Sequence, residues 1–246
     1  MRTICFFMVY HSRPRLTKMS IDDMHMAMCQ LMNHGIQCEG IVIGDSYNVA
    51  QFCHNRGIRH EMFANKPIAH KFTYAWLRAV QQNTDYICWY GSNNVHGAGY
   101  WETCVDVIDN GGSVTFGSTN CVIMSTQPRE SKTCLFHPSE KYLISSGQFF
   151  LRQSLVSNVN LLTLYEEDQT FSFDGSLMDQ LFDSLDDRDI ARVVTYDEED
   201  CIDVKGNVNI HSYTSYMKAG YPAYEDREAI IPRHPSLQAY FNGLYD

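Results

Sequence analysis

The chain has 246 residues, a length that suits one domain, or one domain with a modest extension. With 44% hydrophobic and 20% charged residues, its composition is that of a globular protein and excludes a disordered or fibrous one. The formal net charge of −10 argues against a protein that coats nucleic acid non-specifically, although a local basic site remains compatible with it.

The first half of the chain alternates strand and helix signals. Residues 3–10 form a continuous apolar run, which is typical of a strand buried on both faces. Residues 20–31 have helical spacing, with a capping-box pattern at Ser20 and Asp23 and a C-terminal stop at Gly35. The next expected elements are a strand at 38–43, a helix at 49–55, a strand at 58–63, a helix at 68–82, a strand at 85–89 and a helix at 100–108.

The second half is less regular. We expect paired strands at 113–116 and 120–125, an apolar segment at 143–152, a helix at 174–185 and a strand at 192–196. The tail from Tyr213 is rich in tyrosine and proline and is expected to wrap the surface. We therefore expect one domain at 1–215 and a C-terminal extension at 216–246 that packs on it.

Alternating strands and helices of this length predict a mostly parallel sheet flanked by helices. In such sheets, ligands bind beyond the carboxyl ends of the strands. Three polar segments follow expected strands, and all should lie on that rim: Tyr10-His11-Ser12-Arg13, Gly44-Asp45 and Gly91-Ser92-Asn93-Asn94.

Cysteine usage and hydropathy indicate a soluble protein of the cytoplasm. The nine cysteines are odd in number, form no C-x-x-C pair and mostly sit in apolar runs, which predicts reduced, buried thiols and disfavours a zinc site. The apolar run at 3–10 is short and lacks a cleavage pattern, so it does not resemble a secretory signal. No run reaches the roughly 18 to 20 apolar residues that a membrane span needs.

The segment Ser92-Asn93-Asn94 is the first candidate for chemistry. Side-chain oxygens that follow a strand can hold a divalent metal on a diphosphate, and Asp is the usual ligand because hard cations prefer charged oxygen. Asn offers a weaker, neutral oxygen. The alternative is a polar turn, for which Ser, Asn and Gly are common.

A second candidate is the helix start at Pro67. Lys66 and Lys71 flank it, and cations beside unpaired helix N–H groups favour a phosphate or nucleotide. The alternative is a solvated helix start.

Two later segments carry acids and a histidine. Asp174, between Phe173 and Gly175, could deprotonate an acceptor hydroxyl, or could simply cap a helix. His211 could return to the rim as a metal or phosphate ligand, or could be a surface histidine.

Taken together and in this order, these segments resemble the GT-A glycosyltransferases, particularly the small family-2-like enzymes, over roughly residues 3–215. The resemblance implies the Rossmann-like α/β fold of nucleotide-diphospho-sugar transferases. It also implies an enzyme that moves a hexosyl or pentosyl group from a nucleotide-sugar, a UDP-sugar first, to a hydroxyl acceptor. The segment around Ser145-Ser146-Gly147 is similar to the family's acceptor-side motif of small residues.

The resemblance also assigns roles to single residues. Asp174 and Asp179 occupy the place of the carboxylate that acts as catalytic base, and Asn94 and His211 that of the metal ligands. The remaining positions are implied to bind the donor: Tyr10, His11, Arg13, Asp45, Lys66, Lys71, Ser92, Asn93, Asn94 and Gly147.

This sequence departs from the family where both expected carboxylates are Asn93 and Asn94. Three interpretations follow. Catalysis is metal-independent, with Lys66, Lys71 and Arg13 neutralising the diphosphate; or Mn²⁺ or Mg²⁺ binds weakly through Asn94 and His211; or activity has been lost. Our hypothesis is that any metal is weakly bound or dispensable.

For the acceptor, our hypothesis is a hydroxymethylated pyrimidine in bacteriophage DNA, an analogy with compact, anchor-free glycosyltransferases of large phages. A DNA base would have to be flipped out of the helix. The tail residues Arg227, Arg233 and His234, with nearby tyrosines, could form a local nucleic-acid face. The alternatives are a non-catalytic nucleotide-sugar-binding protein and a nucleotidyltransferase, although the latter usually needs a Gly-rich loop after the first strand.

Overall fold

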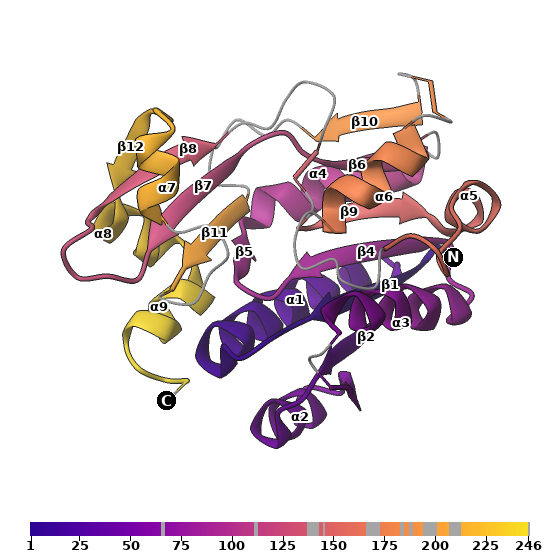
Figure 1. The fold of residues 1–246 in the computed structure, drawn as a ribbon, viewed down its shortest axis with the longest axis horizontal. Helices are drawn as coiled ribbons and strands as arrows, with labels where there is room; N and C mark the ends of the chain where they lie inside the picture. The colour runs from indigo at the N-terminus through magenta and orange to yellow at the C-terminus, as the bar shows by residue number, and fades with distance from the viewer. Residues whose placement is uncertain are drawn as a thin grey trace.

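The computed structural model describes residues 1–64, 67–110, 113–136, 143–144, 146–165, 173–182, 185–186, 189–193, 201–206 and 213–245. Its strands form two sheets (Figure 1). The larger sheet has the order β10 (Ile190–Val193), β6 (Thr115–Ser118), β9 (Gln148–Leu151), β4 (Tyr86–Gly91), β1 (Thr3–Val9), β2 (Gln37–Gly44) and β3 (Arg59–Met62). The smaller has the order β12 (Ala223–Asp226), β8 (Lys132–Phe136), β7 (Cys121–Ser125), β11 (Cys201–Lys205) and β5 (Asn94–His96).

Helices cover both faces of the larger sheet. The described helices are α1 (Pro14–Asn33), α2 (Tyr47–His54), α3 (Ile68–Gln81), α4 (Ala98–Asn110), α5 (Arg152–Asn158), α6 (Phe173–Phe182), α7 (Tyr213–Lys218), α8 (Arg227–Ile230), the short 3-10 helix η2 (Ile231–Arg233) and α9 (Pro235–Phe241). Within the described part of the chain, no helix combines the length and the apolar character needed to cross a membrane.

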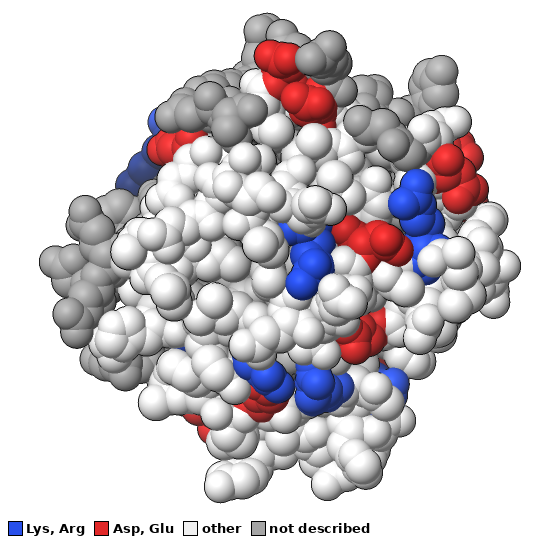
Figure 2. Space-filling view, turned by 90° about the vertical axis from the view of Figure 1, so that its right-hand side faces the viewer, with Lys and Arg blue, Asp and Glu red and all other residues white. Residues whose placement is uncertain are grey.

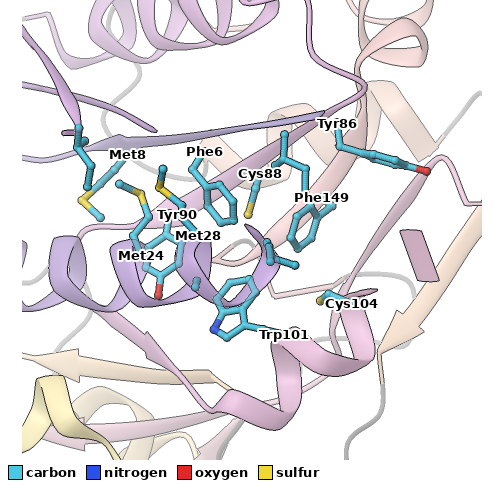
Figure 3. Packing of buried hydrophobic residues seen from close by; sticks show 14 of the residues in the cluster. Phe6, Met8, Met24, Met28, Tyr86, Cys88, Tyr90, Trp101, Cys104 and Phe149 are labelled. Atoms are coloured by element: carbon cyan, nitrogen blue, oxygen red, sulfur yellow. The ribbon is translucent and has the colours of Figure 1, made fainter. Parts of the chain in front are cut away.

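The sheet core explains why β1 is apolar throughout. Its neighbours β2 and β4 run parallel to it, and alternate side chains of β1 enter two different clusters. Phe6 and Met8 pack against α1 and α4. The ring of Phe6 contacts Trp101 of α4 and Phe149 of β9 (Figure 3). Cys5 and Phe7 pack on the opposite face with α3. The predicted α/β fold with a mostly parallel, helix-covered sheet is confirmed.

The prediction for the first helix was wrong at its N-terminus. The helix α1 begins at Pro14, six residues before the expected start, with proline at the first helical position. The capping-box pair Ser20 and Asp23 therefore lies inside the helix, and both side chains are buried. The C-terminal prediction was close: the helix ends at Asn33, and Gly35 follows with φ +78°.

The predicted pairing of strands near 113–116 and 120–125 was also wrong. These segments form β6 and β7, which belong to different sheets: β6 pairs with β9 and β10, and β7 with β8 and β11. The connection between them carries the chain from one sheet to the other.

The tail contributes to the second sheet and its core. The strand β12 pairs antiparallel with β8, and α9 packs on α1. Ile230, Leu237 and Tyr245 lie in the same cluster as Leu16 and Met19 of α1. The tail thus joins the two sheets, and α9 lies beside α1 (Figure 1). All nine cysteines are free, and seven of them are buried, as predicted.

Candidate functional site

The three predicted loops do lie at one edge of the larger sheet. Val9 is in register with Ile43 of β2 and with Gly91 of β4, and all three strands run in the same direction. The residues that follow them, including Tyr10, Asp45 and Ser92, therefore share the carboxyl-end rim. This is the place where open α/β sheets bind ligands.

Tyr10 is a support within this rim. Its side chain is only 2% exposed, and its hydroxyl accepts a hydrogen bond from Ser46 N (2.8 Å) and lies 3.0 Å from His60 Nε2. A Cβ added at Gly44 would lie 2.0 Å from the Tyr10 ring, so only glycine leaves room for it. Tyr10 thus fixes the loop after β2, while His11 and Asp45 are the exposed side chains beside it.

Lys71 is a second support. It is fully buried, and its Nζ donates to the carbonyl of Tyr10 (3.0 Å). Burial lowers the pKa of Lys71 to about 8, against the raising effect of Asp45. Its ammonium therefore ties α3 to the loop after β1 instead of facing a ligand. Pro67 does cap the N-terminus of α3, as predicted, whereas Lys66 lies outside the described residues.

Arg13 is the cation that reaches the end of β4. Its guanidinium donates to Ser92 Oγ (3.1 Å), which joins the loop after β1 to the Ser92-Asn93-Asn94 segment. Burial lowers the pKa of Arg13, and the charge of Asp203 opposes this. Ser12, with φ +52°, provides the turn that brings Arg13 back across the rim.

Asn93 and Asn94 direct their amides into the protein. The Asn93 side-chain NH₂ donates to the Asp203 carboxylate and to Val204 O (3.1 Å), and that of Asn94 lies 3.6 Å from Cys201 Sγ. Both residues are buried. Their side chains join β4 and β5 to β11, so the segment is more than an exposed polar turn.

Asp203 and Lys205 are site residues that the sequence reasoning missed. They lie two residues apart on β11 and therefore on one face, and Lys205 Nζ pairs with Asp203 Oδ2 at 2.5 Å. Lys205 is buried, and burial alone would lower its pKa. The charge of Asp203 outweighs this effect, so the pKa of Lys205 is raised above its ordinary value. The alternation Asp203-Val204-Lys205 before the predicted His211 was the available signal.

The described residues do not fit a divalent metal at this position. Asn94 supplies a neutral amide oxygen, and the adjacent carboxylate, Asp203, is neutralised by Lys205. Arg13 adds a further positive charge nearby. A divalent cation beside Asn94 would be repelled by Arg13 and Lys205, and the carboxylate of Asp203 is already paired with Lys205. This environment is unfavourable for a hard ion that needs charged oxygen ligands.

Beneath the rim lies a buried polar network centred on Asp23. This carboxylate accepts hydrogen bonds from the Tyr90 hydroxyl, from His96 N (2.8 Å) and from Ser236 Oγ (2.9 Å). His96 also contacts the Tyr90 hydroxyl through Nδ1 (3.0 Å) and Ser146 O through Nε2 (3.1 Å). The network connects α1, β4, β5 and α9 with the loop before β9.

Gly147 belongs to this network through its backbone. Its N–H donates to Trp89 O (2.8 Å), its carbonyl accepts from the Tyr100 hydroxyl (2.8 Å), and its φ is +73°. A Cβ here would lie 2.6 Å from His96 Nε2. The small residue predicted at this position is therefore required by close packing on His96 as well as by its backbone conformation.

The hydrogen-bond pattern assigns two protons to the His96 ring. Ser146 O can only accept, so Nε2 donates to it. Because the Tyr90 hydroxyl gives its proton to Asp23, the Tyr90 oxygen must accept from Nδ1. Burial opposes this charge, but Cys201 and Asp23 raise the pKa of His96 to about 10. The network thus holds an imidazolium beside a carboxylate.

We expect stability to fall as the pH rises from neutral toward about 10. A histidine whose pKa is raised from 6.5 to about 10 on folding stabilises the protein fully below the unfolded value and loses that contribution as the pH passes through the folded one. The groups facing it are Asp23, Tyr90, Tyr100 and Cys201. Chemical denaturation of the wild type and of His96→Asn at several pH values between 6 and 10 checks this, and equal pH slopes for both proteins would contradict it.

A cavity of about 460 Å³ opens beside Arg13. Its walls come from the start of α1, the ends of β7 and β11, and α9; the lining includes Arg13, Arg15, Thr126, Gly206, Tyr240 and Phe241. It therefore lies between the rim of the larger sheet and the second sheet.

The remaining predicted residues lie elsewhere. Asp174 occupies the second position of α6, and its side chain is outside what the structure describes; Asp179 is exposed on the same helix. His211 lies outside the described residues, so its position relative to Asn94 stays a prediction. Among the described residues, no group of three or more His, Cys, Asp or Glu side chains is arranged to hold a metal ion.

The residues of the tail cluster make contacts within the protein. Arg227 is buried and donates to Ser125 O (3.1 Å) and Gln127 O (2.9 Å), Arg233 pairs with Glu225, and His234 is buried. Figure 2 shows a different face, the side of the molecule away from the tail, where basic and acidic side chains are interspersed. The described contacts therefore lend no support to the hypothesis that this cluster binds DNA, which stays a prediction.

No protein-family model matches the chain, and no curated protein matches it in sequence. The fold is similar to that of S. aureus TarS residues 1–349, with a TM-score of 0.54 at 12% identity, covering 83% of this chain and 60% of that one. A structure of the same protein with UDP-GlcNAc has a TM-score of 0.51 at 13% identity and covers 95% of this chain and 64% of that one. The UDP complex gives 0.53 at 11% identity.

The chain thus spans about 60% of the TarS structures that it matches. The predicted α/β fold class, a central sheet flanked by helices, is confirmed by this likeness. At this identity the likeness defines the fold.

Proposed function

We propose that the chain is a glycosyltransferase that takes a UDP-sugar as donor and transfers the sugar to a hydroxyl group. The observation that carries this proposal is the rim itself: a GT-A fold with Arg13 bridging to Ser92 at the carboxyl ends of β1 and β4. The structural likeness to a protein solved with UDP and with UDP-GlcNAc supports the choice of donor.

In this proposal the donor binds across the rim, from Asp45 toward Arg13 and Ser92. The exposed side chains His11 and Asp45 contact the nucleoside, and Tyr10 and Lys71 hold the loops beneath it. Arg13 stabilises the negative charge that develops on the leaving diphosphate, which is the electrostatic task that a metal performs in other enzymes of this kind. Asp174 remains our candidate for the base that deprotonates the acceptor, and Asp179 lies five residues further along α6.

We propose that transfer is independent of a metal, because the described donor set is short of charged oxygen and rich in cations. Donor turnover, measured as UDP release by mass spectrometry, should continue in excess EDTA at no less than about half the rate in buffer. An enzyme that loses turnover in EDTA and regains it with Mn²⁺ would overturn this part of the proposal.

The same assay distinguishes the alternatives. UDP-GlcNAc and other nucleotide sugars are supplied with free sugars, with hydroxymethylated DNA, or with buffer alone. Release of UDP under any of these conditions supports a transferase, and the acceptor that gains the mass of a sugar identifies the acceptor class. Binding of donor with no release on long incubation indicates a non-catalytic protein, and release of pyrophosphate from a nucleoside triphosphate and a sugar phosphate indicates a nucleotidyltransferase. DNA enters as one acceptor arm, since no described surface of the tail favours it.

A further inference from the structure

The cavity beside Arg13 differs in charge from the chain as a whole. The protein carries a net charge of −10, yet the described residues that line this cavity include Arg13 and Arg15 and no carboxylate. Such a local reversal of charge concentrates anions at the site.

Arg13 supplies a half-buried positive charge that lines the cavity. Among the described residues its guanidinium donates to Ser92 Oγ and makes no ion pair, while Asp203, the carboxylate that acts on it, is already paired with Lys205. Arg13 lines the cavity, so part of its side chain borders open space. A half-buried guanidinium without an ion-pair partner is stabilised when an anion meets it.

The helix α9 holds the second guanidinium in place. Arg15 lies over the ring of Tyr240, 5.1 Å from its centroid, and Phe241 continues the same wall. Stacking on an aromatic ring restrains a planar guanidinium at the wall of the cavity. The tail thus completes a site whose other wall is the loop after β1.

We infer that this cavity binds a phosphate-bearing ligand, held by Arg13 and Arg15 against the aromatic wall of α9. Guanidinium groups match phosphate oxygens in geometry as well as in charge. A volume of about 460 Å³ exceeds the size of one phosphate, so a second phosphate or a sugar fits with it. This inference builds on the proposed function: the phosphate belongs either to the donor's diphosphate or to a phosphorylated acceptor.

Calorimetry on the full chain tests it, with inorganic pyrophosphate as the probe. We expect pyrophosphate to bind the wild type, and Arg15→Gln and Tyr240→Ala to weaken binding by about tenfold or more, the loss expected for a charge-assisted hydrogen bond. Tyr240→Phe keeps the ring under Arg15 and should bind nearly as the wild type does. Arg2→Gln makes the same change of charge at the other end of β1 and should leave affinity unchanged. Thermal unfolding of each variant verifies that it is folded.

Titration of UDP in the presence of pyrophosphate then identifies the source of the phosphate. If UDP and pyrophosphate compete, and Arg15→Gln leaves the affinity for uridine unchanged, the cavity binds the diphosphate of the donor. If UDP and pyrophosphate bind at the same time, the cavity binds a phosphorylated acceptor. The inference is overturned if pyrophosphate does not bind, or if Arg15→Gln binds it as tightly as Arg2→Gln does. Pyrophosphate binding that depends on Arg15 in a protein that neither binds nor turns over a nucleotide sugar would uphold the inference and refute the proposed function.

Discussion

Asp23→Ala is expected to lower the free energy of unfolding by about 3–5 kcal/mol, the range for removing one partner from a buried charged network. The substitution leaves the Tyr90 hydroxyl, His96 N and Ser236 Oγ without their acceptor, and each is buried. It also leaves the His96 imidazolium without its nearest carboxylate. Urea denaturation followed by circular dichroism measures the change.

Asp106→Ala is the matched control, since Asp106 is exposed on α4 and its loss should change stability by no more than about 0.5 kcal/mol. Asp23→Asn preserves the shape and one acceptor oxygen and should lie between the wild type and Asp23→Ala, which keeps the comparison measurable if the alanine variant does not fold. A loss below about 1 kcal/mol for Asp23→Ala would show that the network is not a major source of stability.

Gly44→Ala is the second substitution with a large expected effect. The new methyl group would lie 2.0 to 2.5 Å from three atoms of the Tyr10 ring, far inside van der Waals contact. The ring has little freedom to move, because its hydroxyl is held by Ser46 N and the backbone of Tyr10 by Lys71. We expect a loss of about 3 kcal/mol, at the upper end of the usual cost of overpacking.

The same change should weaken donor binding, since a displaced Tyr10 ring disturbs the loop that carries Asp45. Gly99→Ala is the control: nothing lies within 4 Å of the added Cβ, and alanine near the start of α4 should be neutral or slightly stabilising. Thermal unfolding and calorimetry with UDP measure both effects. Equal stability of Gly44→Ala and Gly99→Ala would contradict the assigned role of Gly44.

Residues in strongly periodic segments were predictable from the sequence. The apolar run predicted β1, whose successive side chains enter the core on alternate faces of the sheet. The helical spacing predicted α3, which buries one side chain or more on each turn. Since parallel strands bring their carboxyl ends to one edge, the rim that unites Asp45 with Arg13 and Ser92 followed from the order of elements alone.

The predictions failed where a residue fits a local sequence pattern but its partners are distant in sequence. Ser20 and Asp23 have the spacing of a helix cap, but Asp23 is polar because it serves Tyr90, His96 and Ser236, which no local window contains. In the same way, Lys71 reads as a ligand-binding cation near a helix start, whereas the fold directs its ammonium to a backbone carbonyl.

Asp203 was missed for a related reason. Its partners are Asn93, 110 positions earlier, and Lys205 on the same strand, and only the pairing of β5 with β11 brings Asn93 to it. The pairing of β6 with β7 was predicted from proximity in sequence, but long-range contacts place them in separate sheets. Sequence spacing carries no direct information on such pairings.

Hydrogen–deuterium exchange of the full chain, with and without UDP in EDTA, tests the central claim most directly, because it reports where the nucleotide binds. We predict reduced exchange in peptides that cover 10–16, 44–47 and 91–94, the loops at the carboxyl ends of β1, β2 and β4, with no comparable change in 98–110 of α4. Protection confined to other segments, or no protection at UDP concentrations that saturate binding, would contradict a nucleotide-sugar site on this rim.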